Sequence, residues 1–233
     1  MTDIVLVHGA FHGGWCWRQV AGRLRALGHR VFTPTLTGLG ERSHLMSADV
    51  GLETHVQDIT NLFEWEELEA AVLLGHSYGG MPITGAADRI ADRLAALVYL
   101  DAILPEDGES ALSIRSAEPG AVPLPRSADG ITVPTPPATV FGLEGDQAAQ
   151  ADRLLTPHPL ATMSDPVHLT GAWRRVARKL YIRCGQYPGS YFDRFLAAAE
   201  ADPDWIAIGT DLPHNIMMTD PDWLVGVFEE HLL

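Results

Sequence analysis

The stretch that decides the fold is a hydrophobic run ending in a glycine-rich turn, Val72-Leu73-Leu74-Gly75-His76-Ser77-Tyr78-Gly79-Gly80. An apolar run that stops at Gly-x-Ser-x-Gly predicts a buried strand that turns directly into a helix, with the serine Oγ exposed above the sheet. The glycines let strand and helix approach more closely than side chains would allow. Ser77 is therefore predicted to be the nucleophile of an acyl-transfer reaction.

Other apolar runs surround this strand at 71–74, and they predict further strands at 4–7, 30–32, 96–100, 180–184 and 205–208. Apolar residues at helical spacing predict helices over about 17–27 and 56–63. Asp220-Pro221 is typical of the start of a closing helix that ends near Leu232. Strands alternating with helices indicate an α/β fold, with a mostly parallel six-stranded sheet and helices on both of its faces.

The segment 103–165 breaks this regularity, because it is rich in proline and has only a weak helical pattern around 148–155. It is too long for an ordinary loop in a compact domain, so it is either disordered or a lid. Its hydrophobic residues, such as Leu143 and Met163, favour the lid. We expect a core made of residues 1–102 and 166–233, with residues 103–165 inserted as a helical lid.

The composition limits the partners. The chain of 233 residues carries a formal net charge of −14, with 16 basic and 30 acidic side chains, so we expect no nucleic acid and no membrane partner. The longest apolar run falls short of the roughly 18 residues that a membrane span needs. Cys16 and Cys184 are predicted to be buried and unpaired in a cytoplasmic protein. A homodimer is compatible with the sequence.

A serine hydroxyl needs a base, and the base needs a group that orients it. His214 follows the last predicted strand and is the predicted base. Asp101, directly after the strand at 96–100, is the preferred acid. Burying an aspartate at the end of a strand costs desolvation free energy, which a functional partner for the carboxylate would offset. Asp193 and Asp211 stay open as alternatives.

The developing negative charge on the substrate oxygen needs two N–H donors. The backbone amide of Tyr78 supplies one, and the glycine-rich loop after the first strand supplies the other, through the amide of Ala10 or, as an alternative, of Phe11. That loop does not fit Gly-x-Gly-x-x-Gly, which argues against a dinucleotide site.

The remaining histidines are not assigned to the reaction. His76 is predicted to pack and form hydrogen bonds away from Ser77, and His158, His168 and His231 are predicted to be exposed. The sequence has no cluster with metal-ligand spacing, so we predict no metal.

With these residues placed, the chain resembles the α/β-hydrolase superfamily, and within it the plant methylesterases and hydroxynitrile lyases with their bacterial esterase relatives. The resemblance rests on four pieces: residues 6–15, residues 33–42, the elbow at 75–80 and the His214 loop. It implies Ser77 as nucleophile, His214 as base, the Ala10 and Tyr78 amides as the oxyanion hole, and no cofactor.

The resulting hypothesis is a serine hydrolase that cleaves small aryl or alkyl carboxylic esters through an acyl-enzyme, with lactones and thioesters as chemically equivalent substrates. We expect an apolar pocket lined by Phe11, Trp15, Leu143, Leu155 and Met163.

Two alternatives use the same scaffold. One is a hydroxynitrile lyase, although the resembling lyases carry threonine and lysine where this chain has Gly9 and Asn215. The other is a non-enzymatic small-molecule receptor.

Overall fold

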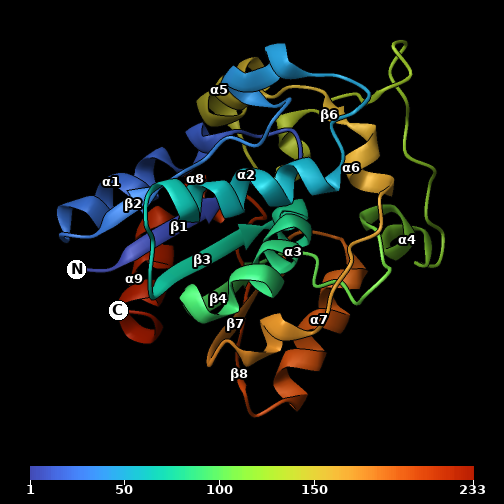
Figure 1. Cartoon of the computed structure of the whole chain (residues 1–233). Coiled ribbons are helices and arrows are strands. Elements are labelled where there is room, and N and C mark those ends of the chain that lie inside the picture. The colour runs from blue at the N-terminus through green and yellow to red at the C-terminus, as the bar shows by residue number, and fades with distance from the viewer.

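A single parallel sheet organises the chain, which the computed structural model describes from residue 1 to residue 233 (Figure 1). Its six strands lie in the order β2-β1-β3-β4-β7-β8 and every neighbouring pair is parallel. The strands are β1 (Asp3–Val7), β2 (Arg30–Phe32), β3 (Ala71–His76), β4 (Leu94–Leu100), β7 (Arg178–Cys184) and β8 (Trp205–Thr210). The predicted six-stranded α/β fold is confirmed.

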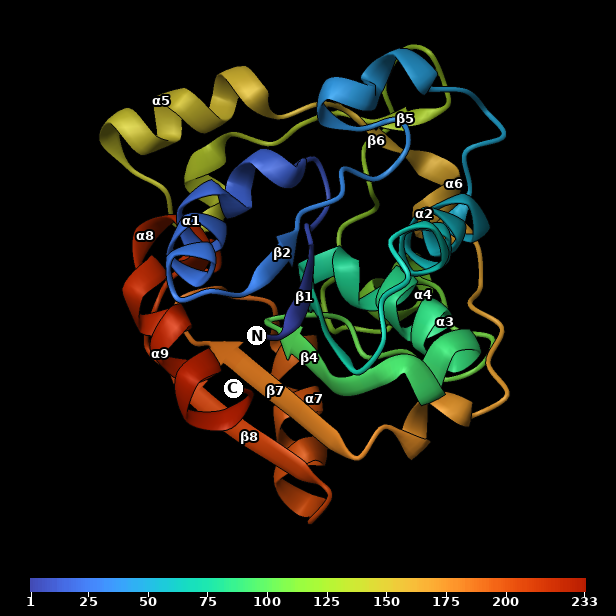
Figure 2. The ribbon, with the colours of Figure 1, turned by 60° about the vertical axis from the view of Figure 1, so that its left-hand side comes forward.

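Helices cover both faces of the sheet. One face carries α2 (Leu52–Trp65), α3 (Gly80–Ile90) and α7 (Ser190–Ala201), and the other carries α1 (Arg18–Ala26), α8 (Ile216–Thr219) and α9 (Pro221–His231). Figure 2 shows α1 and α9 on one side of the strands and α2 and α3 on the other. A parallel sheet needs this double cover because its strands are apolar on both faces.

Strand β1 shows how the two cores form. Val5 and Val7 pack with α2 and α3, whereas Ile4 and Leu6 pack with α1 and α9. All four side chains are fully buried. Successive side chains of a strand point to opposite faces, so one short apolar run supplies both cores.

The segment 103–165, called the lid segment below, forms short elements beside the carboxyl ends of the central strands (Figure 1). They are α4 (Ala111–Ser116), β5 (Thr132–Val133), α5 (Gly145–Leu154), β6 (His158–Pro159) and α6 (Leu160–Ser164). Strands β5 and β6 pair with each other in antiparallel fashion. No helix is long and apolar enough to cross a membrane.

Candidate active site

Ser77 lies at the sharp turn between β3 and α3, with a backbone φ of +54°. A non-glycine residue in this left-handed region is strained, so the neighbouring chain must hold it there. The close contacts explain the two flanking glycines: a Cβ on Gly75 would lie 2.6 Å from the Gly79 carbonyl oxygen, and one on Gly79 would lie 2.8 Å from the His8 carbonyl oxygen. The flanking glycines therefore permit the sharp turn that presents the Ser77 side chain to the cavity.

Asp101 and His214 meet below this turn, although 113 positions separate them in the sequence. His214 Nδ1 and Asp101 Oδ2 lie 2.6 Å apart, and both side chains are buried. The carboxylate can only accept, so Nδ1 carries the proton and Nε2 is left with a free lone pair. His214 Nε2 has no hydrogen-bond partner in the chain, so it is available to take a proton.

The Asp101 carboxylate is compensated on its other oxygen. Oδ1 accepts from Arg183 Nη1 at 2.9 Å and from the Cys184 backbone N–H at 3.1 Å. Arg183 also forms an ion pair with Asp193, whose side chain is 65% exposed. Burying a carboxylate costs free energy unless an opposite charge and hydrogen bonds of this kind compensate it. Asp101 is therefore the carboxylate that contacts His214, and Asp193 contacts Arg183 instead.

The His214 ring is packed between aromatic side chains. Tyr187 stacks on it at 4.0 Å between ring centroids, and His76 lies 4.4 Å away on a tilted ring. His76 Nε2 also donates to the His214 carbonyl oxygen at 3.0 Å. These contacts fix both the ring and the backbone of His214, and they give His76 the hydrogen-bonding role predicted for it.

The glycine-rich loop after β1 approaches Ser77 from the other side. A Cβ on Gly9 would lie 2.9 Å from the Ser77 Cβ, so this loop and the elbow touch. The amide of Phe11 donates to His158 Nδ1 at 3.3 Å, whereas the amide of Ala10 has no partner among the hydrogen bonds of the chain. Of the two predicted donors, Ala10 is the one free to bind a ligand.

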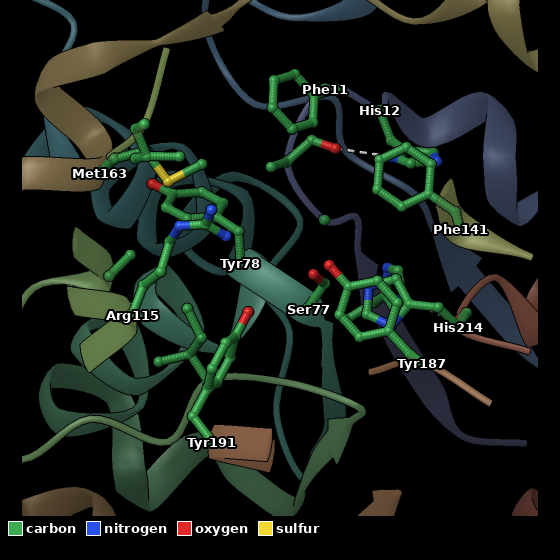
Figure 3. A pocket seen from close by; sticks show the side chains of 16 residues that line it. Phe11, His12, Ser77, Tyr78, Arg115, Phe141, Met163, Tyr187, Tyr191 and His214 are labelled. Atoms are coloured by element: carbon green, nitrogen blue, oxygen red, sulfur yellow. Dashed lines mark hydrogen bonds between the residues drawn. The ribbon is translucent and has the colours of Figure 1, made fainter. Parts of the chain in front are cut away.

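A cavity that opens to solvent lies beside Ser77 and His214. Ser77, His214, Tyr187 and Phe11 face it together (Figure 3). Apolar and aromatic side chains dominate its wall, and the lid segment contributes Ala111, Arg115, Leu124, Phe141 and Met163. A mostly apolar cavity with a few converging polar groups is typical of a small-molecule site. No cluster of His, Cys, Asp or Glu side chains could hold a metal ion.

The alpha/beta hydrolase family profile matches residues 4–227. The chain belongs to this family.

Several proteins of known activity are similar to this hydrolase. A carbendazim hydrolyzing esterase from a Nocardioides species is 40% identical over 96% of this chain and 97% of its own length. A pyrethroid hydrolase of Sphingobium wenxiniae is 38% identical, but the match covers only 46% of this chain and 38% of that protein. Among solved structures, an extracellular α/β-hydrolase from a Paenibacillus species superposes with a TM-score of 0.82 at 22% identity, covering 99% of both chains.

Three residues predicted to line the pocket of this hydrolase lie elsewhere. Leu143 is fully buried in the core beside α1 and α9, and Leu155 is half-buried at the end of α5. Trp15 stacks on the ring of His12, which itself lines the cavity. Leu143 and Leu155 miss the cavity because that part of the lid segment packs against the core instead of over the site. Of the predicted set, only Phe11 and Met163 line the cavity.

The prediction that His158 is exposed is wrong. Its side chain is fully buried beside Phe11 and Tyr78, with ring centroids 5.6 Å and 4.6 Å away, respectively. His168 is exposed as expected, and His231 is half-buried. Sequence spacing gave no signal for His158 because its partners lie about 80 and 150 positions away.

Sequence reasoning also missed Arg183, Arg115 and Tyr187. An arginine within the apolar strand β7 is a detectable signal, since a buried cation requires a carboxylate partner. Tyr187 lies in the loop after β7 and stacks on the His214 ring, a contact that nothing in the sequence around it indicates. Arg115 lines the cavity and donates from Nη2 to the Val122 carbonyl oxygen at 3.3 Å, and nothing in its local sequence marks it.

Burial disfavours the charged form of five histidines outside the Asp101–His214 contact. Burial lowers the pKa of His8 to about 3, and the pKa values of His12 and His55 to about 4. Burial also holds the pKa values of His76 and His158 well below the ordinary value. These rings therefore stay unprotonated in the folded protein over the range in which an exposed histidine would gain a proton.

We predict that this hydrolase is labile in mild acid. The unfolded chain binds protons on these histidines below about pH 6.5 whereas the folded chain does not, so stability is complete above that pH and falls as the pH drops toward 4. Each such histidine removes roughly 2 kcal/mol of unfolding free energy between about pH 7.5 and about pH 5. Urea unfolding at the two pH values measures the loss, and His168→Gln, at an exposed position, should leave it unchanged. Equal unfolding free energies at both pH values would contradict the assignment of neutral histidines.

Proposed function

We propose that this chain is a carboxylic ester hydrolase that acts through an acyl-enzyme on Ser77. The observation that carries the proposal is the buried Asp101–His214 contact of 2.6 Å, with the free His214 Nε2 in the same cavity as the strained Ser77. A nucleophile, a base and a group that orients the base are the parts that this chemistry requires. The esterase relative that matches nearly the whole chain supports it.

In the first half of the reaction, Ser77 Oγ attacks the ester carbonyl carbon while His214 Nε2 takes the hydroxyl proton. The carbonyl oxygen becomes negative and binds the amides of Ala10 and Tyr78. When the tetrahedral intermediate collapses, His214 returns its proton to the departing alcohol, which leaves an acyl group on Ser77. Asp101 stabilises the imidazolium of His214 during this step.

In the second half, water attacks the acyl carbon and His214 again accepts the proton. Collapse of the second intermediate releases the carboxylic acid and restores the Ser77 hydroxyl. The steps balance without a metal or a redox cofactor, so the residues of the site are sufficient for the reaction.

The cavity suits a small ester with an apolar acyl or alcohol part, because Phe11, Phe141, Met163 and Leu124 form much of its wall. Carbendazim is the first substrate to test, since the relative named for its hydrolysis is 40% identical over nearly the whole chain. Small aryl and alkyl esters are the second class. No observation in the site favours the lyase or the receptor, and a homodimer and a cytoplasmic location stay predictions from the sequence.

The Ser77→Ala variant tests the proposal. We expect wild-type protein to hydrolyse p-nitrophenyl acetate and carbendazim, with intact mass spectrometry detecting an acetylated chain from the first substrate. Ser77→Ala should lose at least about 10⁴-fold in kcat and form no acyl-enzyme. Ser164→Ala, at an exposed serine of α6, is the matched control and should keep wild-type activity. Turnover or acylation that survives in Ser77→Ala would overturn the proposal.

A second pair of variants separates the two candidate acids. Asp101→Asn should lower kcat by roughly 10³- to 10⁴-fold, because an amide no longer selects the correct tautomer of His214. Asp193→Asn should stay within about threefold of wild type, because its largely exposed carboxylate contacts Arg183 and not His214. Both are measured by steady-state kinetics on the same ester. A near-normal Asp101→Asn, or a large loss in Asp193→Asn, would reverse the assignment.

A further inference from the structure

The loop between β1 and α1 contains two peptide groups whose orientation decides whether the Ala10 amide can bind an oxyanion. The first joins Gly9 to Ala10. Its carbonyl oxygen accepts from His8 Nδ1 at 2.8 Å, and His8 Nε2 accepts the Leu36 N–H at 3.0 Å. Because the peptide is trans, the Ala10 N–H points away from the His8 ring.

The second peptide group joins Ala10 to Phe11, and histidine rings hold both of its ends. The Ala10 carbonyl oxygen accepts from His12 Nδ1 at 2.7 Å, and the Phe11 N–H donates to His158 Nδ1 at 3.3 Å. His12 is oriented in turn by Asn215, which donates to His12 Nε2 at 2.9 Å. Two of these rings, His8 and His12, come from the loop itself, but His158 comes from the lid segment.

His158 is oriented so that its Nδ1 can only accept. Its Nε2 lies 2.8 Å from Thr162 Oγ1, and that hydroxyl donates to the Pro159 carbonyl oxygen at 2.8 Å. The Thr162 hydroxyl proton is therefore already used in that hydrogen bond. Nε2 must carry the ring proton and donate a hydrogen bond to Thr162 Oγ1. The neutral ring is left with a lone pair on Nδ1, aimed at the Phe11 amide.

Phe11 needs this support because its backbone φ is +68°, in the left-handed region that favours glycine. The lid segment binds it on both sides: His158 accepts from its amide, and the Thr156 N–H donates to its carbonyl oxygen at 3.0 Å. Thr156 Oγ1 also accepts from the Gly40 N–H at 3.0 Å, which ties the same part of the lid segment to a second core loop. The conformation of Phe11 is thus imposed from outside the loop.

We propose that His158 is a positioning residue of the active site: by accepting the Phe11 N–H, it holds the Ala10–Phe11 peptide group so that Ala10, and not Phe11, presents its amide to the oxyanion. The inference rests on the proposed ester hydrolysis. It also gives the lid segment a part in transition-state stabilisation, in addition to lining the cavity.

The consequence of losing His158 follows from the same contacts. Without an acceptor, the buried Phe11 N–H has no partner, so the Ala10–Phe11 peptide group turns to find one and the Ala10 amide shifts with it. Oxyanion donors act mainly in the transition state, so kcat should fall while KM changes little.

Three substitutions at this one position test the proposal. His158→Ala removes the acceptor. His158→Asn places a side-chain oxygen at the position of Nδ1, within reach of Phe11, whereas His158→Gln extends its amide toward Thr162. We expect kcat for p-nitrophenyl acetate to fall roughly 10- to 100-fold in the alanine and glutamine variants and to recover to within about fivefold of wild type in the asparagine variant, with KM within about threefold throughout.

Thermal unfolding of all variants separates positioning from folding, and His168→Ala, an exposed histidine just beyond the lid segment, is the matched control. An unchanged kcat in His158→Ala overturns the proposal, and so does an equal loss of kcat in the asparagine and glutamine variants. If the alanine variant does not fold, the asparagine and glutamine pair still decides. These outcomes leave ester hydrolysis standing, because that is judged separately from the wild type and Ser77→Ala.

Discussion

The hydrogen bond between Asp101 and His214 is the interaction on which the arrangement of the site depends. It brings a charge into the interior, and the fold compensates that charge with the Arg183 guanidinium and the Cys184 amide. These partners come from β7, the neighbour of β4 in the sheet, so the order of the strands itself supplies the compensation. Truncating Arg183 would leave a buried carboxylate without its counter-ion, which typically destabilises a protein by about 3–5 kcal/mol.

Backbone strain is concentrated around the same site. Five non-glycine residues of the chain have a positive φ, and three of them, Phe11, Ser77 and Asp101, follow β1, β3 and β4 at the carboxyl edge of the sheet. Two of them are held by contacts from distant segments: Phe11 by the lid segment, and Asp101 by β7 and the His214 loop. Strained residues persist where the surroundings over-determine them, so the rigid sheet and its neighbours keep the reacting groups in place.

The sequence was sufficient to predict whatever depends on local pattern. The strands, the turn at Ser77 and the positions of Asp101 after β4 and His214 after β8 all follow from apolar runs and the residues that end them. It could not predict which lid residues face the cavity, because no local pattern distinguishes Leu143, which is buried in the core, from Met163, which lines the cavity. The burial of His158 could not be predicted either, because its hydrogen bond to Phe11 spans 147 positions. Of the missed residues, His158, Arg115 and Tyr187 owe their positions at the site to tertiary contacts, whereas Arg183 did carry a local signal within the apolar strand β7.

A crystal structure of the protein inactivated by an aryl alkylphosphonate tests the central claim most directly, because the adduct mimics the tetrahedral intermediate. We expect phosphorus bonded to Ser77 Oγ, with one phosphonyl oxygen about 2.7–3.1 Å from the amides of Ala10 and Tyr78 and His158 still bound to Phe11. Phosphorus on any other residue would contradict the assignment of the nucleophile. A phosphonyl oxygen bound to the Phe11 amide, with His158 displaced, would contradict the assignment of the oxyanion hole.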